Sequence, residues 1–202
     1  MQFKDVLGII PPHQFGKKLE TVTKANFPTI VDATAHYAIV KRRLLLVNGW
    51  HKVAGALSAK FQLITPDNKE GDREAQLGDY LRIVIPGPVC EIGDGFDWVL
   101  VEALEQFAEG DTEAIGFRVR PCAAPFNNSN QTAHFYDTDA CSCFIVMRLS
   151  TEVVVWILER NLTPNDDGEN LTDKIREVVV GLTAIVVGSK IQWKSLADGL
   201  IA

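Results

Sequence analysis

The stretch TDKIREVVVGLTAIVVGSKIQWKSLADGLIA, residues 172–202, decides the fold that this sequence predicts. Its apolar side chains recur at steps of three and four residues, the spacing that places them on one face of an α-helix. Thr172 or Asp173 can cap such a helix at its start. A helix from Thr172 to Asp198 would run about 40 Å, at 1.5 Å per residue. We therefore expect one long amphipathic helix at this end of the chain.

A pair of strands is the alternative for the same stretch. Val178–Val180 and Ile185–Val187 are β-branched, and such residues favour extended backbone. The spacing of Trp193, Leu196 and Leu200 fits a helix and not a strand, so the helix is the favoured prediction.

Upstream of this segment, apolar and polar residues alternate with a period of two, which is typical of half-buried strands. Six strands are expected there, at Leu57–Thr65, Asp79–Ile85, Trp98–Phe107, Ala114–Pro121, Cys141–Leu149 and Glu152–Asn161.

The chain before these six strands predicts one more strand and two helices. Lys18–Ala25 alternates weakly and is expected to be a strand. Asn26–Val47 has helical spacing, with Asn26 as a candidate cap and Pro28 suited to a first turn. Trp50–Ala54 adds a short second helix.

The sequence thus predicts an α+β fold (β-α-α-β6-α), in which a curved antiparallel sheet of about seven strands wraps on the long C-terminal helix. This order of elements, over residues 18–200, resembles the helix-grip fold of the START-like (SRPBCC) superfamily of lipid-transfer, pollen-allergen and polyketide-cyclase proteins. No signature motif accompanies the resemblance. It implies a hydrophobic cavity between sheet and helix that binds a lipid, steroid or polyketide, in carriers and in enzymes. A calycin-like barrel with a terminal helix is the rival fold, and it lacks the early helix at residues 28–47.

Composition limits the domain count and the class of partner. The 202 residues are 47% hydrophobic and 23% charged, which suits a single domain over 1–202 with an extended lead-in at 1–17 draped over it. The net charge of −6 disfavours nucleic acid and anionic membranes, which attract clusters of Lys and Arg.

Hydropathy and cysteine usage indicate the compartment. The longest apolar run, Val178–Gly188, has 11 residues, whereas a membrane span needs roughly 20. The N-terminal residues lack the basic-then-apolar run of a signal peptide. Four cysteines in such a chain suggest reduced thiols, so we expect a cytoplasmic protein without an integral membrane segment.

A two-residue turn at Ser150–Thr151 sets the register of the last two strands. It places Ile145 opposite Trp156 and Phe144 opposite Ile157. Both faces of this hairpin are then apolar, and something must cover the second face. The lead-in, more core or a second copy of the chain could do so, which makes a homodimer possible.

A polar cluster of Arg82, Glu102 and Arg120 is predicted from the register of the middle strands, with Arg118 as a further candidate. Two placements are open for it. At the wall of the apolar pocket the cluster would orient a carboxylate or carbonyl of the ligand. On the convex side of the sheet it would be an exposed salt-bridge ladder.

Four further residues complete the predicted ligand site. Trp50 and His51 are expected near the cavity mouth, where the helices give way to the strands. The indoles of Trp156 and Trp193 would supply contact area. The ligand-binding set is therefore Trp50, His51, Arg82, Glu102, Arg120, Trp156 and Trp193.

No metal site or cofactor is predicted. Cys141 and Cys143 lie near His134, Asp137 and Asp139, but their spacing does not match the paired cysteines of a structural zinc site. The sequence also has no signature of a nucleophilic enzyme.

Three functions are compatible with this reading. The first is binding, with transport as an extension, of a small hydrophobic ligand such as a lipid or polyketide between the sheet and the C-terminal helix. The second is a polyketide cyclase/dehydratase-like enzyme on the same scaffold, with Glu102 or His51 as general base. The third is a non-catalytic interaction module that uses the apolar outer face of residues 141–161.

Overall fold

The computed structural model describes residues 5–55, 58–84, 93–126, 130–165 and 190–202. Its elements are β1 (Lys17–Asn26), α1 (Ile30–Leu45), the 3-10 helix η1 (Val47–Gly49), α2 (Trp50–Ala54), β2 (Lys60–Ile64), β3 (Tyr80–Val84), β4 (Asp97–Glu109), β5 (Thr112–Pro121), β6 (Cys141–Leu149) and β7 (Glu152–Leu162). A last helix spans residues 190–201.

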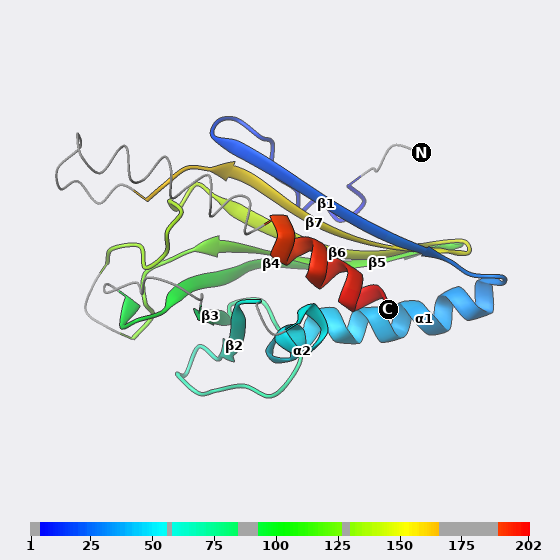
Figure 1. The fold of residues 1–202 in the computed structure, drawn as a ribbon, viewed down its shortest axis with the longest axis horizontal. Coiled ribbons are helices and arrows are strands. Elements are labelled where there is room, and N and C mark those ends of the chain that lie inside the picture. The colour runs from blue at the N-terminus through cyan, green and yellow to red at the C-terminus, as the bar shows by residue number, and fades with distance from the viewer. Residues whose placement is uncertain (1–4, 56–57, 85–92, 127–129, 166–189) are drawn as a thin grey trace.

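The seven strands form one antiparallel sheet in the order β1-β7-β6-β5-β4-β3-β2. Strands β2 to β6 each pair with the next strand in sequence, and β7 also pairs with β1, so β1 and β2 are the edges (Figure 1). The predicted α+β fold with a curved seven-stranded antiparallel sheet is confirmed. The presence of α1 between β1 and β2 excludes the calycin-like alternative, which lacks that helix.

Helix α1 begins later than the sequence suggested. Asn26, the predicted cap, is the last residue of β1 and pairs with Glu152 of β7. The cap is Thr29, whose hydroxyl accepts a hydrogen bond of 3.1 Å from the backbone N–H of Asp32. Pairing with β7 therefore extends the strand and moves the start of the helix to the next residue that can cap it.

The β6–β7 hairpin has the predicted register. Ile145 pairs with Trp156, and Phe144 pairs with Ile157. At the turn Ser150 adopts a positive φ of 53°, and the buried guanidinium of Arg148 donates to the carbonyl of Ser150 at 3.2 Å. The register fixes which side chains of these two strands share a face, and this decides where the candidate site forms.

One face of the sheet, called the helix face here, packs against α1, α2 and the helix at 190–201. Its core includes Leu63 from β2, Val101 from β4, Phe117 from β5 and Phe144 from β6. Trp50 of α2 lies in the middle of this core, with its ring 4.8 Å from that of Phe144. This single cluster joins every layer of the fold.

The opposite face, called the outer face, is covered in part by the chain's own lead-in. Ile9 is buried against Cys143, Ile145 and Leu158. Asp5 accepts three backbone N–H bonds from the turn that follows it. The apolar outer face that raised the possibility of a homodimer is therefore covered, at these residues, by residues 5–10 of the same chain.

The C-terminal helix is tied to the body at its last turn. His36 Nε2 lies 2.7 Å from the carbonyl oxygen of Ile201, and Arg43 donates to the carbonyl of Leu200 at 3.0 Å. Residues 190–198 are helical as predicted, and the helix continues to residue 201. Residues 172–189 of the predicted helix lie outside the described residues.

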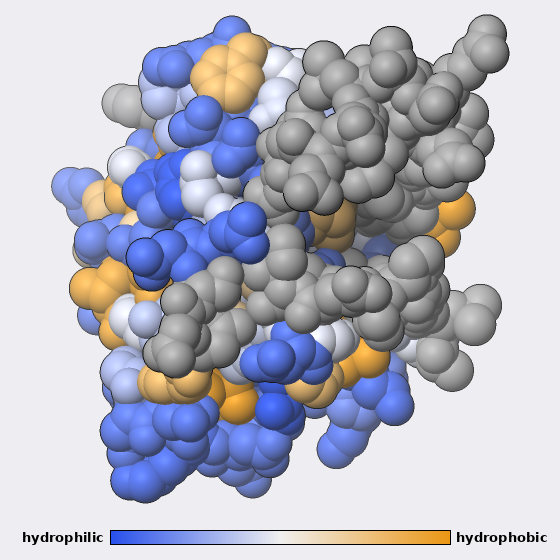
Figure 2. All heavy atoms as spheres, turned by 90° about the vertical axis from the view of Figure 1, so that its left-hand side faces the viewer, coloured by the Kyte–Doolittle hydropathy of each residue, from blue (hydrophilic) through white to orange (hydrophobic). Residues whose placement is uncertain are grey.

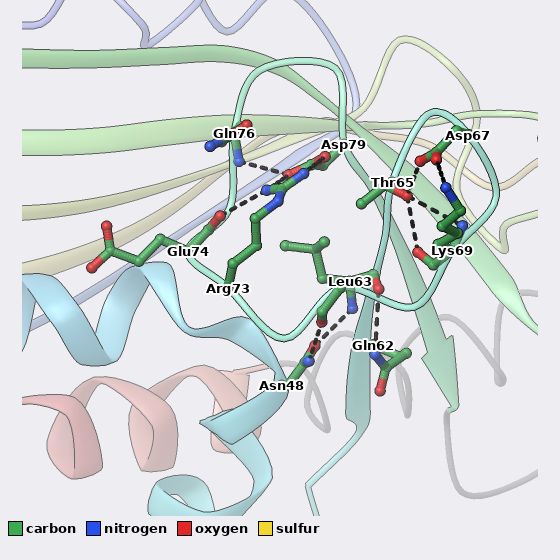
Figure 3. Close-up of polar contacts among 11 residues, drawn as sticks. Asn48, Gln62, Leu63, Thr65, Asp67, Lys69, Arg73, Glu74, Gln76 and Asp79 are labelled. Atoms are coloured by element: carbon green, nitrogen blue, oxygen red, sulfur yellow. Dashed lines mark hydrogen bonds and ion pairs between the residues drawn. The ribbon is translucent and has the colours of Figure 1, made fainter.

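The loop between β2 and β3 is fixed by a carboxylate and an amide (Figure 3). Asp79 is only 1% exposed and accepts two bonds from the guanidinium of Arg73, at 2.7 and 2.8 Å. Asn48 of η1 accepts from the N–H of Leu63 and donates to the carbonyl of Gly71, both at 2.7 Å. The Asn48 bonds hold β2 against η1, and the Arg73–Asp79 pair fixes the loop to the start of β3.

The surface at the end of the sheet that faces the viewer in Figure 2 is mostly hydrophilic over the described residues. Hydrophobic side chains appear there in separate small areas. Among the described residues, no helix combines the length and apolarity needed to cross a bilayer.

The crossing of the C-terminal helix over α2 predicts a specific sensitivity to one methyl group. A Cβ on Gly199 would lie 2.1 Å from the carbonyl oxygen of Val53, which is backbone and cannot give way cheaply. We expect Gly199→Ala to lower the free energy of unfolding by about 1–3 kcal/mol, as overpacking does. Urea denaturation measures this change.

Gly49→Ala is the matched control, because a Cβ there meets no atom within 4 Å. It should leave stability unchanged or raise it by up to about 1 kcal/mol. Equal effects of the two substitutions would contradict the close crossing.

Candidate functional site

A cavity of about 50 Å³ lies on the helix face, between the sheet and the C-terminal helix. Its walls come from strands β2 to β7, from the connection between β5 and β6, and from the helix at 190–201. The described residues that line it are Phe61, Leu81, Ile83, Val99, Val119, His134, Tyr136, Ser142, Phe144, Glu159 and Trp193.

The apolar wall is closed by Trp193. Its ring lies 5.4 Å from Phe144, edge-on, and 6.2 Å from Phe61. Leu196 and Leu200, three and seven residues further along the helix, are buried in the same core. The helix therefore holds the indole over the sheet, as the spacing of these three residues predicted.

Glu159 and Ser142 form the polar end of the cavity. They are cross-strand partners on β7 and β6, and their oxygens Oγ and Oε1 lie 3.5 Å apart. Val153, Val155 and Ile157 precede Glu159 in the inward-facing row of β7. The alternation of a β-strand therefore places this carboxyl in the interior.

The segment before β6 supplies the other polar side chains. Its backbone is fixed beside the end of β7, where Tyr136 bridges to Pro164 and Asp137 donates to the carbonyl of Thr163. His134 Nδ1 accepts from the N–H of Tyr136 at 2.9 Å. This acceptor role leaves the proton of the neutral imidazole on Nε2.

Burial sets the protonation of the two ionisable groups. Glu159 is 2% exposed, and burial raises its pKa from 4.5 to about 7, against the opposing effects of Trp193 and Ser142. Burial lowers the pKa of His134 to about 3. At neutral pH the cavity thus holds a neutral imidazole beside a carboxyl group that is present in both of its forms.

No cation neutralises Glu159 within the part of the chain that the structure describes. Arg160, the next residue, projects from the other side of β7 and pairs with Glu20 at 2.7 Å. Trp193 lies near enough to Glu159 for its indole N–H to lower the pKa of the carboxyl, but the buried atoms Glu159 Oε2 and Trp193 Nε1 make no well-aligned hydrogen bond among the described residues. An acceptor and a donor thus lie on residues that line the same cavity.

Trp193 is the residue of the predicted ligand site that lines this cavity. Trp50 lies behind the wall, packed 5.0 Å from Phe61, and its indole N–H donates to the carbonyl of Leu44 at 3.0 Å. His51 lies on α2 and is not part of the described lining. Trp156 is on the outer face, against the cluster of Ile9.

The predicted Arg82–Glu102–Arg120 cluster does not form as expected. Arg82 pairs across the strands with Trp98 and donates to Glu70 at 2.7 Å. Strands β3 and β4 pair in a regular register that places Arg82 opposite Trp98, four residues before Glu102, so Glu102 is not a cross-strand neighbour of Arg82.

Glu102 instead binds two arginines of β5 on the outer face. Arg118 Nε donates to one oxygen of Glu102, and Arg120 Nε donates to the other at 2.7 Å. Arg118 also donates to the carbonyl of Ile9 at 2.7 Å. Burial would raise the pKa of Glu102, but both arginines outweigh it and hold the pKa below its usual range. The cluster therefore lies under the lead-in, away from the cavity.

Sequence reasoning missed Glu159, Ser142 and Tyr136. The signal for Glu159 was present, because it continues the inward row of Val153, Val155 and Ile157 at the same spacing of two. Among the described residues, no group of three or more His, Cys, Asp or Glu is placed to hold a metal ion.

Neither a scan of protein-family models nor a search of curated proteins gives a match. Similar solved structures include the Zhui aromatase/cyclase from Streptomyces sp. R1128, at 12% identity and TM-score 0.48 over 92% of this chain and 93% of that chain. Truncated norcoclaurine synthase from Thalictrum flavum has 10% identity and TM-score 0.43 over 93% and 95%. Ginseng major latex-like protein 151 from Panax ginseng has 10% identity and TM-score 0.38 over 87% and 99%. Likeness this distant carries no activity, ligand or partner over to this chain.

The raised pKa of Glu159 predicts a pH dependence of stability. Between pH 4.5 and 7 the folded chain keeps a proton that the unfolded chain has lost, so the free energy of unfolding falls as pH rises through this window. A shift of this size corresponds to about 3 kcal/mol. Glu159→Gln, which does not titrate, should gain about this much over the unmodified protein between pH 4.5 and 8.

The measurement is the difference in unfolding free energy between the two proteins at each pH. His134 acts in the opposite direction, because its depressed pKa makes stability fall as pH drops below 6.5. Both proteins carry His134, so its contribution cancels in the difference. A difference that stays constant from pH 4.5 to 8 would show that Glu159 is solvated.

Because Arg82 and Glu102 belong to separate ion pairs, substitutions at the two positions should lower stability by different amounts. Arg82→Ala breaks a pair with an exposed partner and should cost less than about 1 kcal/mol. Glu102→Gln leaves two partly buried arginines without their anion and should cost about 1–2 kcal/mol. Thermal denaturation compares the two, and equal costs would contradict the assignment of Glu102 as the centre of the cluster.

Proposed function

We propose that this protein binds a small hydrophobic molecule on the helix face, in the cavity beneath Trp193, with Glu159 as a polar contact. The observation that carries this proposal is an apolar chamber with one buried carboxyl oxygen that has no partner among the described residues. Apolar walls with a few convergent polar groups are the usual features of small-molecule sites. Transport of that molecule would use the same chamber.

The size of the chamber sets a condition on the ligand. About 50 Å³ accommodates one or a few waters, whereas pockets for drug-sized ligands have roughly 300–1,000 Å³. A lipid or polyketide would therefore enter only with displacement of a wall. Trp193 is the part of the described lining that the helix at 190–201 supplies, so displacement of that side chain would enlarge the chamber on its helix side.

A second candidate function is acid–base catalysis in the same cavity. The pKa of Glu159 near 7 is the value at which a carboxyl both accepts and donates protons efficiently at neutral pH. Glu102 is a poor general base, because two arginines stabilise its ionised form. His51 lies outside the described lining. Enzymatic activity on this scaffold would therefore use Glu159.

The interaction-module hypothesis is less well supported. Its surface was the apolar outer face of residues 141–161, and Ile9 with its neighbours covers part of that face. The predicted cytoplasmic location and the homodimer stay predictions.

Binding of the neutral fluorescent probe N-phenyl-1-naphthylamine tests the proposed function. We expect saturable binding that a cavity-filling substitution, Val119→Phe, weakens at least tenfold, because Val119 lines the chamber. Val119→Ile adds only one methylene, so it should weaken probe binding less than Val119→Phe. This smaller substitution replaces Val119→Phe in the test if the phenylalanine variant does not fold.

Val22→Phe is the matched control, since Val22 is exposed on the outer face. Unchanged affinity in both Val119 variants, or no saturable binding to the unmodified protein, would exclude the chamber as a ligand site.

A further inference from the structure

We propose that the polar group recognised in the helix-face cavity is a hydroxyl, so that the ligand is a hydrophobic alcohol or phenol. This inference rests on the proposed function, because it names the ligand class for the same cavity. It starts from two buried atoms, Glu159 Oε2 and Trp193 Nε1, on residues that line one cavity. Trp193 lies near enough to lower the pKa of Glu159, but neither atom makes a well-aligned hydrogen bond among the described residues.

The two atoms have opposite hydrogen-bonding roles. The indole nitrogen of Trp193 can only donate, and the ionised carboxylate of Glu159 can only accept. Leaving either buried without a partner is costly, so a bound group that satisfies both is favoured over one that satisfies a single atom. A hydroxyl does this, because its oxygen accepts from the indole and its proton goes to the carboxylate.

The other common polar groups satisfy the site incompletely. A ketone accepts from Trp193 but has no proton for the carboxylate. An ammonium group donates to Glu159 but cannot accept from Trp193. A hydrocarbon leaves both atoms unpaired.

The remaining polar groups of the cavity point to the same class. His134 is neutral, and its Nε2–H is a further donor. Ser142 and Tyr136 contribute hydroxyls to the lining. No Lys, Arg or Asp lines the cavity among the described residues, so a charged ligand group would meet no fixed opposite charge except Glu159 itself.

The two protonation states of Glu159 separate the ligand classes by pH. A hydroxyl can donate to the carboxylate or accept from the protonated acid, so its affinity should change little across neutral pH. An ammonium ligand gains affinity as Glu159 ionises, and a ketone loses the donor that the protonated acid offers.

The experiment compares four probes of similar size by isothermal titration calorimetry at pH 6 and pH 8. The probes are 4-methylphenol, toluene, benzylamine and acetophenone. We expect 4-methylphenol to bind at least tenfold more tightly than toluene, and its affinity to change less than twofold between the two pH values. At pH 6, where Glu159 is mostly protonated, benzylamine should bind no more tightly than toluene. At pH 8, where Glu159 is mostly ionised, acetophenone should bind no more tightly than toluene.

Two variants assign the preference to the two atoms. Trp193→Phe removes the N–H and keeps an aromatic ring, and Glu159→Met removes the carboxyl with a side chain of similar length. Each should reduce the ratio of phenol to toluene affinity at least threefold, while toluene binding itself reports that the cavity is intact. Trp156→Phe on the outer face is the matched control and should leave the ratio unchanged.

Several results would overturn the inference. Equal binding of toluene and 4-methylphenol would show that the cavity does not select a hydroxyl. Tighter binding of benzylamine that rises with pH would assign a cationic ligand instead. If N-phenyl-1-naphthylamine binds but none of the four probes does, the hydroxyl inference fails and the proposed function stands. If no probe of either kind binds, the proposed function fails as well.

Discussion

A sheet whose two faces are both apolar must be covered on both sides, and this requirement organises the whole molecule. The hairpin of β6 and β7 creates it, because its register places Phe144 and Ile157 on one face and Ile145 and Leu158 on the other. Helices α1, α2 and the helix at 190–201 cover the first face. Residues 5–10 cover part of the second. Burial of apolar area on this scale is the dominant favourable term in folding.

Because both faces are covered, carboxyl groups are buried or partly buried on each of them, and the two faces compensate the charge in different ways. On the outer face Glu102 lies between Arg118 and Arg120, where charge balances charge. On the helix face Glu159 has no such counterion in the described part of the structure, and the protein tolerates it by raising its pKa. A buried carboxyl without a counterion costs stability, and this cost is the physical basis for proposing Glu159 as the polar contact of the chamber.

The sequence predicted most of the architecture because period and turn chemistry are local properties. Ser150–Thr151 determined the β6–β7 register, and the spacing of Trp193, Leu196 and Leu200 identified both a helix and its buried face. The polar site was harder to predict, because it depends on long-range register. The register of β3 against β4 places Arg82 opposite Trp98 instead of beside Glu102. Tyr136 and His134 reach the cavity through a connection whose path depends on contacts with the end of β7, which no periodicity encodes.

Residues 5–10 cover a cysteine on the outer face, so the reactivity of that cysteine depends on whether the segment is in place. Cys143 is fully buried, and its sulfur lies 3.5 Å from the carbonyl oxygen of Ile9. A thiol reagent reaches this sulfur only when the covering segment detaches, so the labelling rate measures local opening separately from global unfolding. Labelling of Cys143, followed separately from that of the partly exposed Cys122, therefore reports on the N-terminal cover and not on the chamber on the other side of the sheet.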